Sequence, residues 1–250
     1  MGIEIKSTRE IELMRKAGEI VAIVLDILKK RIKPGIITEE LDTIAIEELN
    51  RHGAKSSFKG YRGYPAHLCV SVNDELVHGI PGKRVLKEGD IVTIDFGAVY
   101  NGFHGDAART IAVGEISDTA KKLIDTTDNA LMVGIESARN GARLGDVSYA
   151  IQSFVEANGF SVVREYAGHG IGRQMHEDPQ IPNYGKPGQG PVLKKGMALA
   201  LEPMVTQGDW HTKVGRDEWT VSTMDGSLCA HFEDTIVVTE GKAEILTALV

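Results

Sequence analysis

Residues 90–113 read DIVTIDFGAVYNGFHGDAARTIAV, and this stretch decides the fold. Segments 90–99 and 104–113 each alternate well enough to form a strand, and Asn101-Gly102 between them is typical of a two-residue hairpin turn. The residues around Asp95 are nearly all apolar, which favours a strand covered on both faces over an exposed hairpin with one polar face. We therefore expect a buried antiparallel hairpin here.

The turn also sets the register of the hairpin, and this register brings two acids together. With Asn101 and Gly102 at the turn, Asp106 lies opposite Gly97. Asp95 is two residues from Gly97 and points to the same face. The two acids are then diagonal neighbours, about 7 to 8 Å apart at the backbone. Carboxylates this close repel each other unless one is protonated or a cation lies between them, so we interpret the pair as metal ligands.

The second half of the chain repeats the pattern. Residues 85–95 (VLKEGDIVTID) and 192–202 (VLKKGMALALE) carry a glycine and a final carboxylate at matching positions. The repeat predicts strands over 197–205 and 231–239, with Glu202 in the place of Asp95 and Glu233 in the place of Asp106. The long loop over 206–230, which contains Trp210, His211 and Trp219, is of a length that is often functional. Two equivalent hairpins would thus direct four acids towards one axis.

The helices repeat as well. Apolar spacing predicts a helix over 8–32, and a second helix begins near Thr38, whose side chain can cap it, and ends before Gly53. The segment from Gly141 to Gly159 matches the one from Gly35 to Gly53, and 119–139 reads as a helix that joins the halves. We infer an internal duplication, with halves 8–115 and 119–240 packed as one α+β domain over 1–250.

Three histidines are candidates for the same site. His169 lies between two glycines that let the backbone approach closely. Beside four converging carboxylates, we interpret it as a ligand of two divalent cations about 3.5 to 4 Å apart. His78 shares the sequence His-Gly-Ile with His169, and His176 follows seven residues later. For each of the last two, a structural role is an equal alternative.

Composition excludes several classes of protein. The net charge of −7 argues against a general nucleic-acid-binding face, and we expect no sequence-specific nucleic-acid partner. No run of about twenty apolar residues predicts a membrane span, and the N-terminus lacks the features of a secretory signal, so we expect a cytoplasmic protein. The two cysteines, Cys69 and Cys229, indicate no disulfide framework.

These motifs closely resemble the type I methionine aminopeptidases, within the metal-dependent pita-bread family that also includes prolidase and aminopeptidase P. The resemblance extends over about residues 5–240 and is carried by segments 63–69, 71–81, 95–106, 168–177, 202–203 and 233–235. It implies a pita-bread fold, in which pseudo-twofold halves form an antiparallel sheet covered by helices. It also implies that Asp106 and Glu233 bridge two metal ions, that Asp95 completes one site, and that His169 and Glu202 complete the other.

The resemblance further implies an activity, the removal of the initiator methionine from nascent chains with a small second residue. A hydroxide held between the two ions would attack the first peptide bond. Glu202 would shuttle a proton, His176 would contact the scissile carbonyl, and His78 would contact the leaving nitrogen. The metals would be Co, Mn, Fe(II) or Zn. The resemblance also allows a monovalent cation near Asn73, which the spacing does not support.

An apolar pocket for the methionine side chain is also implied. Its walls would be Phe58, Tyr61, Tyr64, Cys69, Met175 and Trp219. Many bacterial relatives have a cysteine at the position of Phe58 and an aromatic residue at that of Met175, so this pocket has its own outline. We expect the partners to be nascent polypeptide N-termini, with transient ribosome association by family analogy, and we expect a monomer.

Three alternatives have the same fold. A proline-directed aminopeptidase or dipeptidase usually carries an extra N-terminal domain, whereas about ninety residues precede Asp95 here. Type II methionine aminopeptidases insert a helical subdomain between the last two acids, for which the interval from Glu202 to Glu233 is too short. A non-catalytic pita-bread binding module would have lost ligands, and this sequence keeps all five.

Overall fold

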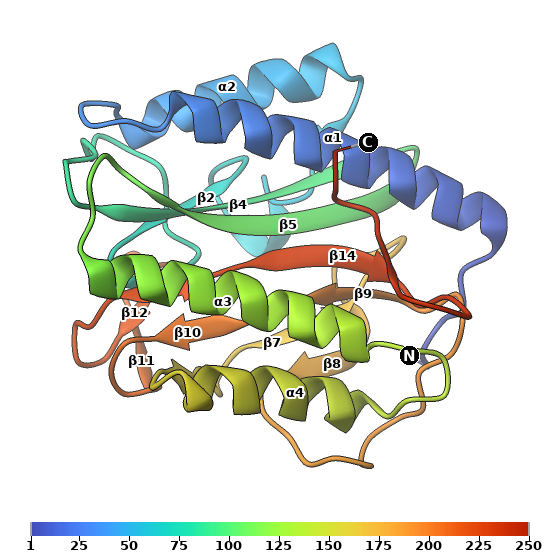
Figure 1. The fold of residues 1–250 in the computed structure, drawn as a ribbon. Helices are drawn as coiled ribbons and strands as arrows, with labels where there is room; N and C mark the ends of the chain where they lie inside the picture. Colours follow the sequence, from blue (N-terminus) through green and yellow to red (C-terminus); the bar gives the residue numbers. More distant parts are fainter. Residues whose placement is uncertain (1, 250) are drawn as a thin grey trace.

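The computed structural model describes residues 2–249 and contains four α-helices around one large sheet (Figure 1). The helices are α1 (Thr8–Arg31), α2 (Thr38–Arg51), α3 (Asp118–Ser137) and α4 (Leu144–Ala157), and a short 3-10 helix, η1, covers Tyr61–Gly63. The strands are β1 (Lys55–Ser56), β2 (Cys69–Val72), β3 (Glu75–Val77), β4 (Ile91–Tyr100), β5 (Phe103–Ala112), β6 (Ser161–Val162), β7 (Ala167–Gly170), β8 (Glu177–Pro182), β9 (Ala198–Leu201), β10 (Met204–Thr206), β11 (Thr212–Val214), β12 (Val221–Thr223), β13 (Cys229–His231), β14 (Glu233–Val237) and β15 (Glu244–Ile245).

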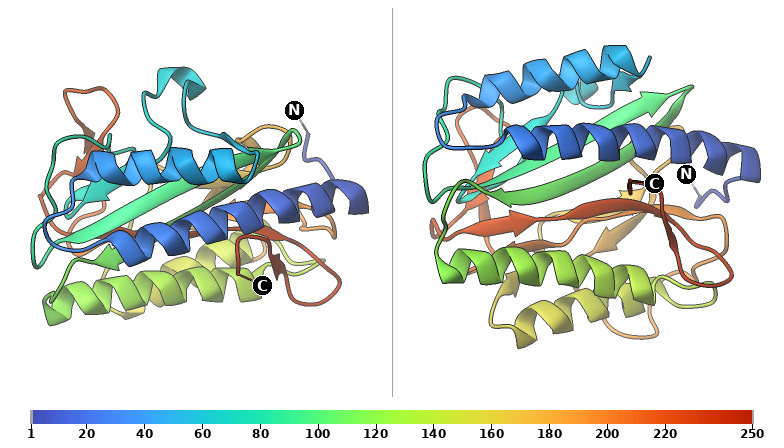
Figure 2. Two further views of the ribbon diagram at one scale, coloured as in Figure 1. Left: turned by 90° about the horizontal axis from the view of Figure 1, so that it is seen from above. Right: turned by 45° about the horizontal axis from the view of Figure 1, so that its top comes forward.

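The main sheet joins strands from both ends of the chain. Its order is β1-β4-β5-β14-β9-β7-β8, with β2 paired to β4 and β15 paired to β14. Figure 1 shows α1 and α2 over one half, α3 and α4 over the other, and β5 beside β14 between them. The left view of Figure 2 shows the helices on one side of the sheet, and η1 and the β11–β12 hairpin on the other. Among the described residues, every helix is too short or too polar to cross a membrane.

The helices recur at a constant interval. α2 and α4 both begin and end 106 residues apart, and α3 ends 106 residues after α1. Isolated backbone bridges join Ile37 to Val85 and Arg143 to Val192. The residue before α2 and the residue before α4 therefore pair with equivalent segments, each within its own half. Segment 119–139, predicted only to join the halves, is thus the counterpart of α1. These matches support the proposed duplication.

The first hairpin has the predicted register. Gly97 pairs with Asp106 across β4 and β5, and the positive φ angles of Asn101 (48°) and Gly102 (82°) form the turn. Residues 91–98 of β4 are all buried, because helices pack on one face and the loops of the site on the other. Behind this hairpin, Gly105 contacts α1 at backbone distance, since an added Cβ atom would lie 2.8 Å from the Gly18 nitrogen.

Three local predictions are wrong. The continuous strands expected over 197–205 and 231–239 are each interrupted, because Glu202-Pro203 separates β9 from β10 and Phe232 separates β13 from β14. Pro203 has no N–H to continue the ladder, and the chain passes there from the main sheet into the small β13-β10-β6 sheet.

The long loop over 206–230, for which the sequence predicted no elements, has regular structure of its own. It contains β11 and β12, which form a hairpin, and β12 pairs with β3. The N-cap of α2 is Ile37 rather than Thr38, because the Thr38 hydroxyl instead donates to the Gly82 carbonyl at 3.0 Å. The Glu40 carboxylate accepts from the Ile37 N–H at 3.1 Å and takes over part of the capping role.

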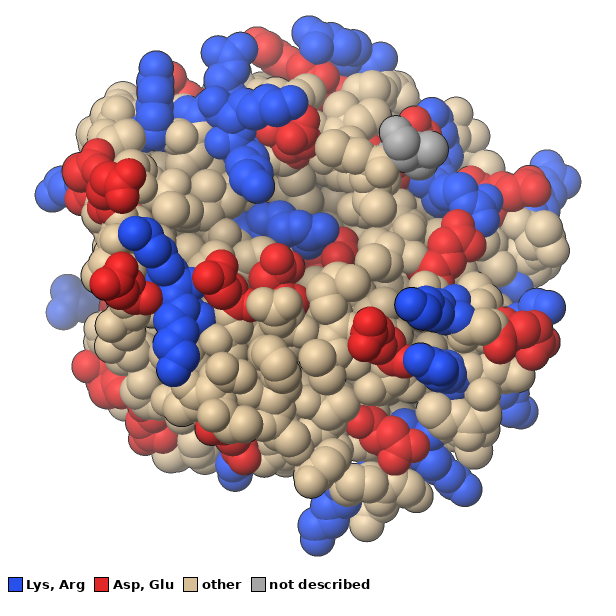
Figure 3. Space-filling view, viewed as in Figure 1, with Lys and Arg blue, Asp and Glu red and all other residues tan. Residues whose placement is uncertain are grey.

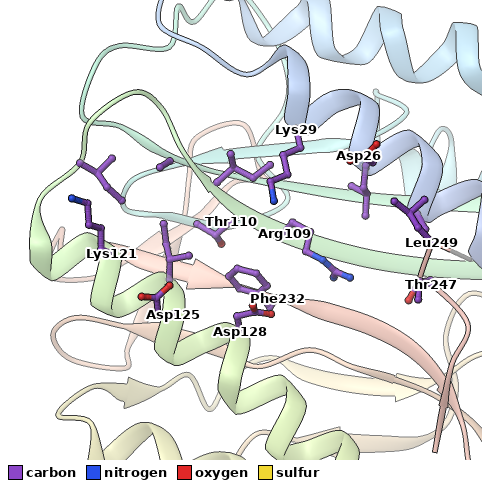
Figure 4. A pocket seen from close by; sticks show the side chains of 17 residues that line it. Asp26, Lys29, Arg109, Thr110, Lys121, Asp125, Asp128, Phe232, Thr247 and Leu249 are labelled. Carbon is purple, nitrogen blue, oxygen red and sulfur yellow. The ribbon is translucent and has the colours of Figure 1, made fainter.

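A mixed-charge hollow lies on the helix side, between α1 and α3. Its volume is about 790 Å³, and Figure 3 shows basic and acidic side chains around it. Figure 4 shows Arg109, which comes from β5, in the space between the two helices, with its guanidinium on the side of Thr247. The Arg109 guanidinium donates to the Glu233 carbonyl and to the Asp234 carboxylate, so it ties β5 to β14 from behind the site described next.

Candidate metal centre

The interruptions in the second hairpin create the site. Leu201 pairs with Asp234 on one side of the interruption, and Met204 pairs with His231 on the other. Between these pairs the two strands separate into different sheets, and only the Phe232 N–H reaches across, to the Pro203 carbonyl at 3.3 Å. The acids at the interruption, Glu202 and Glu233, therefore turn away from the ladder towards a common cavity.

All five predicted metal ligands line this one cavity of about 150 Å³. They come from β4, β5, β7, the β9–β10 interruption and the start of β14, and they are Asp95, Asp106, His169, Glu202 and Glu233. Donor atoms of Asp106, His169 and Glu233 lie within 4.8 Å of one another. The Nε2 atom of His169 is 3.7 Å from Glu202 Oε1.

Asp95, Asp106 and Glu233 are buried and Glu202 is half-buried, and within residues 2–249 no Lys or Arg side chain pairs with any of the four acids. Burial raises the pKa of Asp95 to about 7, and burial and then the Asp95 charge raise the pKa of Asp106 well above its ordinary value. Burial and the neighbouring acids raise the pKa values of Glu202 and Glu233 in the same way. Oxygens of Asp95, Asp106 and Glu233 have no hydrogen-bond partner within 2–249. Orphaned carboxylate oxygens that converge on one cavity fit divalent cations well.

The imidazole of His169 is prepared to act as a ligand. Its Nδ1–H donates to the Gly170 carbonyl at 2.9 Å, which leaves Nε2 unprotonated and facing the acids. Burial lowers the pKa of His169 to about 4, so the ring is neutral at pH 7. A neutral histidine whose other nitrogen is held by a carbonyl is the usual arrangement of a metal-binding histidine.

The other two predicted histidines border the same cavity. His176 Nδ1 is 2.9 Å from the Tyr61 hydroxyl, and its ring centre is 4.2 Å from that of His169. Burial, followed by the charge of a protonated His169, lowers the pKa of His176 to about 3. His78 has a positive φ of 60°, its ring meets Trp219 edge-on, and burial lowers its pKa. Both rings are therefore neutral hydrogen-bonding groups at pH 7.

An aromatic wall closes the cavity on one side. The six residues predicted to form it all line the cavity, and they are Phe58, Tyr61, Tyr64, Cys69, Met175 and Trp219. The ring of Tyr64 meets Phe58 and Trp219 edge-on, and its hydroxyl donates to the Gly79 carbonyl at 2.9 Å. Burial raises the pKa of the Cys69 thiol, which keeps it protonated and apolar.

Two residues at the site were not among the sequence predictions. Arg62 has a positive φ of 48° and lines both this cavity and a neighbouring one of about 430 Å³. His231 is 1% exposed and lies beside Glu202 and Glu233. The repeat contained a signal for His231, since it aligns with His104, but no signal in the sequence singled out Arg62.

The fold and these side chains define a class of protein, a metal-dependent hydrolase with its candidate ligands on the strands of one antiparallel sheet. Residues 12–240 match the family described as Metallopeptidase family M24, and the chain belongs to that family. Membership in a metallopeptidase family implies the use of divalent metal.

Within this family, the chain is similar to methionine aminopeptidases over nearly its whole length. It is 57% identical to Methionine aminopeptidase 1 of Bacillus subtilis, covering 97% of this chain and 98% of that protein. It is 54% identical to the Clostridium perfringens enzyme, covering 99% of both. The crystal structure of methionine aminopeptidase from Thermotoga maritima has a TM-score of 0.98 at 54% identity, covering 99% of this chain and 100% of that one. The predicted resemblance and the pita-bread fold are confirmed.

Proposed function

We propose that this protein is a type I methionine aminopeptidase, which removes the N-terminal methionine from nascent proteins and peptides with a small second residue. The observation that carries the proposal is the group of buried acids with orphaned oxygens beside a neutral His169, next to a cavity with an aromatic wall. The relatives named methionine aminopeptidase, at 54 to 57% identity, support the same activity.

In this proposal the five ligands divide between two divalent cations. Asp106 and Glu233 would contribute to both sites, Asp95 would complete one, and His169 and Glu202 would complete the other. Bound divalent cations supply Lewis acidity and activate water for attack on a carbonyl at neutral pH. Because carboxylate-rich sites accept several first-row ions, the candidates remain Co, Mn, Fe(II) and Zn.

The remaining side chains act on the substrate. Tyr61 fixes the His176 ring, so that its other nitrogen can donate to the oxygen on which negative charge develops. His78 contacts the nitrogen on the leaving side, and Glu202 moves a proton between water and that nitrogen. The aromatic wall holds the thioether of methionine, which makes favourable contacts with ring edges.

The proline-directed alternative has weaker support. Prolidase from Pyrococcus furiosus is 25% identical, with a TM-score of 0.81, and this chain covers 66% of its length. The methionine aminopeptidases are about twice as similar and nearly equal in length. A non-catalytic module is disfavoured because the whole ligand set is present and buried around one cavity.

The predicted partners follow from the proposed activity. Nascent polypeptide N-termini would be the substrates, in the cytoplasm, with a transient association with the ribosome. The protein would act as a monomer.

The test uses the metal-free protein with Met-Ala-Ser, Met-Leu-Ser and Ala-Ala-Ser peptides, each with Mn, Fe(II), Co or Zn added. We expect release of the N-terminal residue from Met-Ala-Ser only, and only with an added metal. Asp106→Ala, which removes a bridging ligand, should abolish release while the outer helices remain folded by circular dichroism. Release without metal, or equal release from all three peptides, would contradict the proposal.

A further inference from the structure

His231 is a buried histidine to which neither the predicted ligand set nor the predicted substrate contacts assign a role. It is 1% exposed, and neither of its ring nitrogens has a hydrogen-bond partner in the described part of the chain. Burying an imidazole without a partner costs free energy, and most buried polar groups in folded proteins are satisfied. Such a side chain therefore points to an interaction that forms when the site is in its working state.

The ring faces two of the proposed ligands. His231 Nε2 lies 3.6 Å from Glu202 Oε2 and 3.8 Å from Glu233 Oε2. Both separations exceed a normal hydrogen bond, so a small movement of either side chain would complete one. Suitable atoms of all three residues lie within 4.8 Å of one another.

Glu202 lies between two imidazoles, one at each oxygen. Its Oε1 is 3.7 Å from His169 Nε2, and its Oε2 is 3.6 Å from His231 Nε2. Two ligand atoms that each lie about 2.0 to 2.2 Å from one ion can be 3.7 Å apart, so Glu202 Oε1 and His169 Nε2 can share a cation. Glu202 Oε2 is then free to accept a hydrogen bond from His231.

Hydrogen bonds from Thr110 on β5 hold the backbone of His231. The Thr110 hydroxyl accepts from the His231 N–H at 2.9 Å and donates to the His231 carbonyl at 2.9 Å. A second hydroxyl, that of Thr93, lies 2.8 Å from Thr110 Oγ1. This double contact fixes the position from which the ring extends, which is what a residue that orients a neighbour requires.

We propose that His231 is a positioning residue, whose Nε2–H donates to Glu202 Oε2 and so fixes Oε1 towards His169 and their shared cation. The inference rests on the proposed function, because it assigns a metal to Glu202. The contact also leaves Glu202 in one orientation for its proposed second role as proton shuttle. Groups of this kind, which orient a metal ligand, typically change metal affinity by about 10- to 100-fold when removed.

The experiment compares His231→Leu, which removes the donor, with His231→Gln, whose amide nitrogen can replace Nε2–H. The probe is Co(II) added to the metal-free protein. Its affinity is measured by competition with a chelator, and its coordination by the visible absorption spectrum. Cys229→Ala, two residues away on β13 and also buried, is the matched control. We expect His231→Leu to weaken Co(II) binding about 10- to 100-fold, and His231→Gln to restore most of it with an unchanged spectrum.

Two results would overturn the positioning role. One is wild-type Co(II) affinity in His231→Leu. The other is a changed Co(II) spectrum in His231→Gln that indicates the loss of a nitrogen ligand, because His231 would then bind the metal itself. If His231→Leu does not fold, His231→Asn takes its place, since its amide is one carbon too short, and equal affinities of the Asn and Gln variants would also overturn the role. Failure of the wild-type chain to bind Co(II) would instead refute the proposed function.

Discussion

Asp106 and Asp234 are both buried acids at the β5–β14 junction, but their surroundings are opposite. The Asp234 carboxylate accepts from Arg109 at 2.6 Å and from the Thr247 hydroxyl at 2.7 Å. Asp106 faces other acids, and its Oδ1 has no hydrogen-bond partner within the described chain. The contacts with Arg109 and Thr247 therefore offset part of the cost of burying Asp234, whereas Asp106 Oδ1 has no such partner within the described chain, as expected of a proposed metal ligand.

This contrast gives a paired prediction for the metal-free protein. Asp106→Asn should raise the melting temperature, because it removes one of four repelling acids, and should abolish metal binding and turnover. Asp234→Asn should lower stability by roughly 1 to 3 kcal/mol, since a charged partner of Arg109 is lost. Thermal melts and Co(II) titrations check both variants. A lower melting temperature for Asp106→Asn would contradict this account of the site.

A second prediction concerns the hydroxyl of Tyr61. Tyr61→Phe keeps the aromatic wall but removes the group that lies 2.9 Å from His176 Nδ1. If Tyr61 orients the His176 ring, kcat should fall by about 10- to 100-fold while KM changes little, because a misoriented ring loses only part of the roughly 10²- to 10⁴-fold contribution of such a group. Steady-state kinetics with a Met-Ala peptide test it. Trp219→Phe, which changes the wall itself, should raise KM instead. The same effect on kcat and KM in both variants would refute the orienting role of Tyr61.

Single residues differ in how far the sequence reveals them. Asp95 and Asp106 could be paired in advance because an Asn-Gly turn leaves one register. His231 and His104 occupy equivalent positions in the repeat, but His104 Nδ1 pairs with the Ser57 hydroxyl at 2.9 Å, whereas His231 faces Glu202. Which partner each ring meets depends on segments distant in sequence, so the repeat alone could not distinguish the two roles.

Among the elements, β5 and α1 form the closest contact behind the site. An added Cβ on Gly105 would lie 2.8 Å from the Gly18 nitrogen, and Asp106 is the next residue on the strand. Gly105→Ala should push α1 away from β5 and cost about 1 to 3 kcal/mol, the usual range for overpacking. It should also lower turnover by moving Asp106.

Gly82→Ala is the matched control for this variant. An added Cβ at Gly82 would meet no atom within 4 Å, and its φ is not positive, so its effect should be small. Chemical denaturation of the metal-free proteins measures both costs. Equal stability of Gly105→Ala and Gly82→Ala would show that α1 can shift freely on the sheet.

The regular elements could be predicted where local patterns are strong. The helix expected over 8–32 is α1, Thr8–Arg31, because apolar spacing and the Ser7–Glu10 capping box both define it. The second hairpin was predicted as continuous because its apolar residues alternate on both sides of Glu202-Pro203. Its division between two sheets depends on tertiary pairing with β5 and β6, which no local pattern contains.

For the whole molecule, the critical feature is the short strand pairing that joins the two halves. β4 and β5 pair over ten residues, whereas β5 and β14 pair only through Ala108 with Glu233 and Ala107 with Asp234. A side chain adds to this pairing between β5 and β14. The Thr235 hydroxyl both accepts from the Asp106 N–H at 3.0 Å and donates to the Asp106 carbonyl at 2.8 Å. The spacing of the two proposed bridging acids therefore depends on how the halves dock.

Burial of the site also makes the stability of the whole molecule depend on pH. The folded protein holds the pKa of Asp95 at about 7 and those of Asp106, Glu202 and Glu233 well above their ordinary values. Above about pH 4.5 these acids are ionised when unfolded, but the folded protein keeps them protonated to higher pH, so its stability falls as the pH rises from there through each folded pKa. Below about pH 6.5, the buried histidines oppose this trend, because their lowered pKa values favour protonation of the unfolded chain.

Between about pH 7 and 8 the histidines are mostly neutral in both states, so groups whose pKa is raised in the folded protein, above all the acids of the site, should govern this part of the profile. We expect the melting temperature of the metal-free protein to fall across this interval. With Mn added it should fall less or rise, because metal binding replaces the protons and strengthens as they leave. Melts with a chelator or with Mn, at several pH values, measure both profiles. Asp106→Asn should flatten the metal-free profile, and a metal-free melting temperature that rises with pH would mean that the four acids are already neutralised within the folded chain.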